Sequence, residues 1–164
     1  MTSHYSPVLK LQRLIDEFCS SELDWEIPGK SESEPTYTGR VLVPKFEAFV
    51  RKVSEPNLTF RADKSSYGRP KPIFFDNQPM YPDISFEYLG IRTVAIEVKY
   101  LEDQGFSGSM ATAIGQGLAY AAWGYEYSHV LMISKTGGFS VPKTEVNVLN
   151  ENLKTSGVKF HIIC

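Results

Sequence analysis

The fold is decided by residues 82–99, which read PDISFEYLGIRTVAIEVK. Apolar and polar side chains alternate over positions 84–88, as they do in a strand with one buried face. Leu89-Gly90 then supplies a turn signal, and positions 91–99 resume a β-rich run. We therefore expect this stretch to form a β-hairpin.

The hairpin carries acidic side chains where a metal ion could bind. Asp83 begins the first strand and Glu97 lies near the end of the second. Because side chains alternate along a strand, Glu97 and Lys99 share one face while Val98 points to the other. Hard divalent cations prefer oxygen ligands, and a lysine beside them can face a scissile phosphate. The pattern is typical of a metal-dependent nuclease site.

The flanking sequence adds helices and further strands. Apolar periodicity and turn residues predict helices over 7–23, 44–53, 109–124 and 144–153, short strands over 130–133 and 158–163, and a loop or linker over 26–39. This order predicts an α/β domain with a mixed central β-sheet flanked by helices. We expect one domain over 1–164, with a helix-and-loop extension over 1–40 and a core over 41–164.

With Pro82-Asp83 followed by Glu97-Val98-Lys99, the chain resembles the PD-(D/E)XK nuclease superfamily. The helix after the lysine strand carries Gln116 and Tyr120 four residues apart, which resembles the extra motif of the RecB-like branch. The resemblance implies a restriction-endonuclease-like core in the order αβββαβ. It also implies hydrolysis of phosphodiester bonds in DNA.

Each site residue has a role under this resemblance. Asp83, Glu97 and the Val98 backbone carbonyl would bind Mg²⁺ or Mn²⁺. Lys99 would orient or help deprotonate a water molecule and stabilise charge on the phosphate. Gln116 and Tyr120 would contact substrate or position Lys99, although packing against the sheet is an alternative for this helix face.

In the same superfamily a glutamate on the helix before the strands often joins the metal site. Glu47 is the first candidate for that position and Glu17 the second. The alternative for Glu47 is an ion pair with Arg51, four residues further along the same predicted helix.

A basic stretch precedes the hairpin. Its members are Arg61, Lys64, Arg69 and Lys71, in a loop that is rich in serine, glycine and proline. The net charge of the whole chain is −2, so a nucleic-acid contact would depend on local charge of this kind. We expect the four side chains to grip the phosphate backbone; a solvated surface loop is the alternative.

Composition excludes several other classes of protein. Hydrophobic residues make up 42% of the chain, but no apolar run approaches the ~20 residues that span a bilayer. The N-terminal stretch mixes charged and apolar residues, unlike a secretory signal, so we expect an intracellular protein with no membrane partner. The cysteines and histidines show no metal-ligand spacing, which argues against a zinc or iron–sulfur site; they are Cys19, Cys164, His4, His129 and His161.

Three hypotheses remain open at this level. The first is an active DNA nuclease in repair, recombination, mobile-element biology or defence, possibly a homodimer that cuts both strands. The second is a catalytically silent nucleic-acid-binding or assembly subunit on the same fold. The third is coincidence, in which Asp83 caps a turn while Glu97 and Lys99 are ordinary residues of an edge strand.

Overall fold

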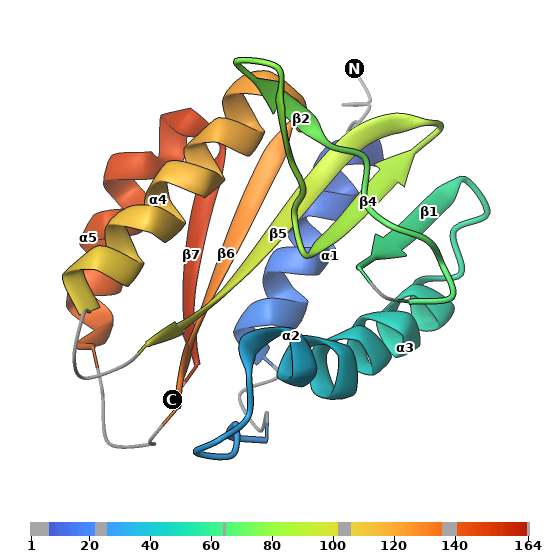
Figure 1. Ribbon diagram of the computed structural model, residues 1–164. Coiled ribbons are helices and arrows are strands. Elements are labelled where there is room, and N and C mark those ends of the chain that lie inside the picture. Colours follow the sequence, from blue (N-terminus) through green and yellow to red (C-terminus); the bar gives the residue numbers. More distant parts are fainter. Residues whose placement is uncertain (1–6, 22–25, 64, 102–105, 136–140, 164) are drawn as a thin grey trace.

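The computed structural model has a mixed β-sheet with helices on both of its faces (Figure 1). It describes residues 7–21, 26–63, 65–101, 106–135 and 141–163. None of the helices in these ranges combines the length and apolarity that crossing a membrane requires. The α/β class and the mixed central sheet agree with the prediction.

The sheet has five strands in the order β1-β4-β5-β6-β7. Antiparallel pairing joins β1 to β4 and β4 to β5, whereas β5, β6 and β7 pair in parallel. The strands are β1 (Leu58–Ala62), β4 (Ile84–Tyr88), β5 (Ile91–Leu101), β6 (Tyr127–Ser134) and β7 (Val158–Ile163). The longest strand, β5, therefore lies at the centre, where the antiparallel and parallel halves meet.

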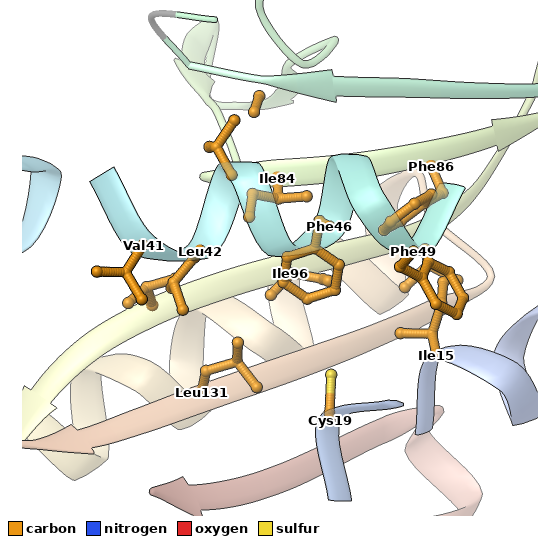
Figure 2. Packing of buried hydrophobic residues seen from close by; sticks show 14 of the residues in the cluster. Ile15, Cys19, Val41, Leu42, Phe46, Phe49, Ile84, Phe86, Ile96 and Leu131 are labelled. Carbon is orange, nitrogen blue, oxygen red and sulfur yellow. The ribbon is translucent and has the colours of Figure 1, made fainter. Parts of the chain in front are cut away.

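Two layers of helices cover the sheet. Helices α1 (Pro7–Ser21) and α3 (Val43–Val53) share the larger apolar cluster with one face, and α4 (Phe106–Trp123) and α5 (Lys143–Leu153) pack on the other. Figure 2 shows Phe46 and Phe49 of α3 lying over the strands. The Phe46 ring is fully buried between the Phe18 and Phe86 rings. Burial of such rings supplies most of the cohesion between α3 and the sheet.

The predicted β-hairpin is confirmed as β4 and β5. Its turn residues, Leu89 and Gly90, have positive φ angles of 52° and 79°, as a two-residue turn of type I′ requires. A second, unpredicted hairpin is formed by β2 (Ile73–Phe75) and β3 (Gln78–Met80), with Asp76 and Asn77 at its turn. This small hairpin leads directly into the Pro82-Asp83 motif.

The prediction of a loop over residues 26–39 was wrong for its last part. A short helix, α2 (Glu34–Tyr37), continues through a π-helical turn, η1 (Thr38–Leu42), into α3. The Ser33 hydroxyl accepts a hydrogen bond from the Thr36 amide and so caps α2. The expected boundary at residue 40 therefore falls inside a continuous helical stretch. The remaining helical turn, η2 (Lys154–Ser156), follows α5.

The close approach of α4 to the sheet depends on Gly117. A Cβ atom at this position would lie 2.9 Å from Val130 Cγ2 and 3.1 Å from Val158 Cγ1, whereas a Cβ atom at Gly115 would meet nothing within 4 Å. Both valines are buried and β-branched, so neither can easily move away.

We expect Gly117→Ala to lower the free energy of unfolding by about 1–2 kcal/mol, because overpacking outweighs the gain in helix propensity. Gly115→Ala, two residues away on the same helix, is the matched control and should raise it by about 0.5–1 kcal/mol. Urea denaturation measures both. Equal effects of the two substitutions would contradict the close packing of α4.

Candidate active site

Asp83 is held at the start of β4 by the neighbouring strand. Its Oδ2 atom accepts a hydrogen bond of 2.8 Å from the backbone N–H of Val98 in β5. In a strand, the N–H and C=O groups of one residue point to the same side. The Val98 carbonyl therefore points toward the side of β5 on which Asp83 lies, as a shared metal site would require.

Glu97 lies on β5 with both of its carboxylate oxygens engaged. Its Oε1 atom is 2.8 Å from Lys99 Nζ, and its Oε2 atom is 3.0 Å from the Tyr120 hydroxyl of α4. Only 3% of the Glu97 side chain is exposed. The sequence prediction that Glu97 and Lys99 share one strand face is confirmed by this contact.

Glu34 joins these residues, although the sequence analysis did not select it. Its Oε1 atom lies 3.2 Å from Lys99 Nζ, and its Oε2 atom accepts a hydrogen bond from the Tyr100 amide. Glu34 is the first residue of α2, where Ser33 caps the helix and proline follows in the first turn. Serine before a helix and proline at its start are known start signals, so this helix could have been found.

Burial shapes the protonation of the carboxylates. Burial first, and repulsion by Glu97 second, raise the pKa of Asp83 to about 7. Burial also raises the pKa of Glu97, although Lys99 and the Tyr120 hydroxyl oppose the shift. Burial and the closeness of two acidic groups thus outweigh the opposing effect of Lys99 on both carboxyl groups.

Lys99 keeps its proton in this setting. Burial alone would lower its pKa, but Glu97 and, more weakly, Glu34 and Asp83 outweigh that effect, so the pKa is raised. Lys99 is therefore a fixed positive charge between two glutamates. A protonated lysine of this kind stabilises negative charge and is no proton acceptor.

Tyr120 connects α4 to the segment that precedes Asp83. Its hydroxyl lies 2.8 Å from the Tyr81 carbonyl oxygen and 3.0 Å from Glu97 Oε2, so one hydrogen faces two acceptors. Burial and the nearby Glu97 raise the pKa of Tyr120, which keeps the hydroxyl protonated. Gln116, one turn earlier, is half-buried, and its Oε1 atom accepts no hydrogen bond from the described residues.

The basic stretch is mostly committed to carboxylates. Arg61 Nε and Lys71 Nζ bind the two oxygens of Glu87, at 3.2 Å and 2.6 Å, and the Glu87 side chain is only 3% exposed. A buried carboxylate needs such partners, so these two cations serve the fold. Lys64 lies outside the described residues.

Arg69 is the exception within the stretch. Its guanidinium lies 3.6 Å from the centroid of the Tyr81 ring, and its ion pair with Asp63, at 3.4 Å, is exposed. Tyr81 is two residues from Asp83 in the sequence, so Arg69 contacts the segment that leads into the motif.

The alternative metal ligands lie apart from this group. Glu47 lies on α3 with a half-buried side chain and, among the described residues, has no hydrogen bond or ion pair with Asp83, Glu97, Lys99 or Arg51. Glu17 forms an exposed ion pair with Arg13 on α1 and lines a cleft of about 730 Å³ between α1 and α3. Instead of Glu47, Glu34 on the preceding helical segment contacts Lys99.

A second group of potential metal ligands consists of cysteine and histidine side chains that lie far apart in the sequence. One ligand atom each of Cys19, His129 and His161 lies within 4.8 Å of the others, and all three side chains are buried. Sequence spacing could not reveal this group, because the three residues belong to α1, β6 and β7. Cys164 and His4 lie outside the described residues.

The carboxylate group has the oxygen donors that a hard divalent cation requires. Each ionised carboxylate oxygen has more than one lone pair, so Asp83 and Glu97 can bind a cation while they keep their present hydrogen bonds. Comparison with protein-family models, with characterised proteins and with solved structures finds no match to this chain. The function must therefore be inferred from the site itself.

The raised pKa of Asp83 predicts a pH-dependent stability of the metal-free protein. Between the ordinary carboxyl pKa of about 4 and the raised value of about 7, the folded state binds the Asp83 proton more tightly than the unfolded state. The stabilising contribution of this group is thus present at low pH and lost as the pH rises.

We expect the free energy of unfolding of the wild type, relative to Asp83→Asn, to fall by about 1–2 kcal/mol from pH 4 to pH 7.5. Both proteins are unfolded with urea in the presence of a chelator. The contributions of groups that do not interact with Asp83 cancel in the difference between the two proteins. Parallel pH profiles would show that Asp83 titrates normally.

Proposed function

We propose that this chain is a divalent-metal-dependent nuclease that hydrolyses phosphodiester bonds in DNA. The observation that carries the proposal is the meeting of Asp83, Glu97 and Lys99 at one end of the central hairpin, with Asp83 bound to the Val98 amide. A scaffold would have little use for buried carboxylates that repel each other, because each costs folding free energy. In an enzyme, this loss of folding free energy is offset by the catalytic role of the carboxylates.

Asp83, Glu97 and the Val98 carbonyl would hold Mg²⁺ or Mn²⁺. When bound, the ion would polarise a phosphoryl oxygen and lower the pKa of a bound water molecule. The fit rests on the chemistry of the donors, which are all oxygens, and on the raised pKa values of both carboxyl groups. A cation at this position would relieve their repulsion and favour the ionised forms.

Lys99 would act on the phosphate through its charge. Because its pKa is raised, it enters the reaction protonated and stabilises the negative charge that grows on the phosphoryl oxygens. We therefore assign Lys99 the stabilisation of phosphate charge, and no longer the deprotonation of a water molecule. Glu34 and Glu97 fix the ammonium group from two sides, so that the charge is positioned before the substrate arrives.

Tyr120 and Gln116 would support the site from α4. Tyr120 holds the Glu97 carboxylate and the Tyr81 carbonyl at the same time, so it positions the metal ligand relative to the Pro82-Asp83 turn. Gln116 retains a free acceptor one turn away, which could meet the substrate. Arg69, on the Tyr81 ring, is the basic residue best placed to contact the phosphate backbone.

The test is cleavage of labelled single-stranded, double-stranded, flap and junction DNA with Mg²⁺ or Mn²⁺. We expect Asp83→Ala and Glu97→Ala to lower the cleavage rate by about a thousandfold or more. Lys99→Met keeps the length of the side chain and removes its charge, so it should slow cleavage about a hundredfold while binding changes by about threefold at most.

Glu126→Ala removes an exposed carboxylate from the turn before β6 and serves as the control with unchanged activity. Cleavage that persists in both carboxylate variants would overturn the assignment of the site. Wild-type protein that binds DNA and metal but cuts no substrate would instead support the silent subunit. Equal losses of binding and cleavage in Lys99→Met would make Lys99 a backbone contact only.

A further inference from the structure

A buried group of metal-binding side chains lies on the α1 face of the sheet, apart from the carboxylate site. Asp16 and Cys19 are three residues apart on α1 and so lie on the same side of the helix. His129 belongs to β6 and His161 to β7, whose register pairs His161 with Leu131. Since Leu131 faces the apolar cluster under α1, both histidines face that helix as well.

The donor atoms are almost close enough to share one ion. His129 Nδ1 is 2.9 Å from His161 Nε2. Asp16 Oδ1 is 3.7 Å from the same His161 nitrogen. The Cys19 sulfur lies within 4.8 Å of a nitrogen atom of each histidine ring. Ligands of a tetrahedral zinc ion are about 3.3–3.6 Å apart, given typical Zn–N and Zn–S distances. Shifts of about 1 Å would bring Cys19, His129 and His161 into this range, whereas Asp16, which lies outside this set of mutually close donors, would have to move its carboxylate further.

The polar atoms of this group are incompletely satisfied. Asp16 Oδ1 and His129 Nε2 are buried and form no hydrogen bond with the described residues. Cys19 is 2% exposed and His129 1%. Buried polar atoms without partners are costly, and each calls for an explanation. An ion bound to His129 Nδ1 and His161 Nε2 would replace the hydrogen bond between the two rings, and it would give Asp16 Oδ1 a partner.

The types of donor identify the ion. Thiolate and imidazole are ligands of borderline or soft metals such as Zn²⁺ and are unsuited to Mg²⁺. One thiolate, one carboxylate and two neutral imidazoles carry two negative charges, which Zn²⁺ would neutralise within the protein interior. Lys159 forms an ion pair with the other oxygen of Asp16 and would orient that ligand.

An entry path adjoins the group. A cleft of about 260 Å³ is lined by side chains that include Asp16, His129 and Lys159. Cys19 lies deeper, and Figure 2 shows its side chain pointing from α1 toward the sheet. An ion could therefore reach the donors from solvent without separation of α1 from the strands.

We propose that Asp16, Cys19, His129 and His161 form a structural Zn²⁺ site that ties α1 to β6 and β7. Four protein ligands, three of them buried, leave no open coordination site for a substrate, as in other structural zinc sites. The site is independent of the proposed nuclease activity. The competing explanation is a neutral histidine pair joined by the observed hydrogen bond, with Cys19 as a packing residue.

Cobalt substitution distinguishes these explanations. Metal-stripped protein is titrated with Co²⁺, whose tetrahedral complexes absorb strongly in the visible region and whose bond to a thiolate adds a charge-transfer band in the near ultraviolet. We expect one thiolate-bound Co²⁺ per chain and its displacement by an equivalent of Zn²⁺. Zn²⁺ should also raise the midpoint of thermal unfolding of the stripped protein.

Matched variants assign the ligand. Cys19→Ser should abolish the charge-transfer band, whereas Cys164→Ser, which removes the other cysteine, should keep it. Asp83→Asn should also keep it, because the carboxylate site contains no thiolate; this separates the outcome from that of the nuclease test. A wild-type protein without the band overturns the proposal even if Cys19→Ser fails to fold, and so does a band that is lost only in Cys164→Ser.

Discussion

The pairing of buried carboxylates along the α4 face of β4 and β5 is the constraint on which much of this structure depends. Glu87 and Glu97 are buried and Asp83 is half-buried, and all three need partners, because an isolated buried charge costs several kcal/mol. Each finds a different solution: a backbone amide for Asp83, two cations for Glu87, and a lysine with a tyrosine for Glu97. The partners come from β5, the basic stretch and α4.

These pairings explain the arrangement of the surrounding elements. Lys99 attracts Glu34, which brings the start of α2 to β5. Tyr120 anchors α4 to the segment before Asp83, and the close contact at Gly117 lets the helix lie near enough to do so. Glu87 is paired with two cations, whereas burial, and at Asp83 also repulsion by Glu97, raises the pKa values of Asp83 and Glu97. The latter pair is therefore the candidate cation site.

The sequence predicted those features that depend on near neighbours. The hairpin followed from alternation over 84–88 and a Leu89-Gly90 turn, and Glu97 and Lys99 shared a face because strands have a period of two. Glu34 was missed because the residues around it are rich in serine, glutamate and proline, a composition that is typical of a loop. In the folded protein, the contacts of Glu34 with Lys99 and Tyr100 favour the helix instead. The Cys19 cluster could not be found, since its members are distant in sequence and meet only through the parallel pairing of β6 and β7 and the packing of α1 on these strands.

The central claim is that a divalent cation binds between Asp83 and Glu97. Paramagnetic Mn²⁺ tests it most directly, since it broadens the NMR signals of nearby nuclei in a ¹⁵N-labelled protein. The account predicts that substoichiometric Mn²⁺ first broadens the amide signals of Asp83 and of residues 97–99, and that Glu97→Gln removes the effect. Broadening centred elsewhere, or equal broadening in the variant, would contradict it.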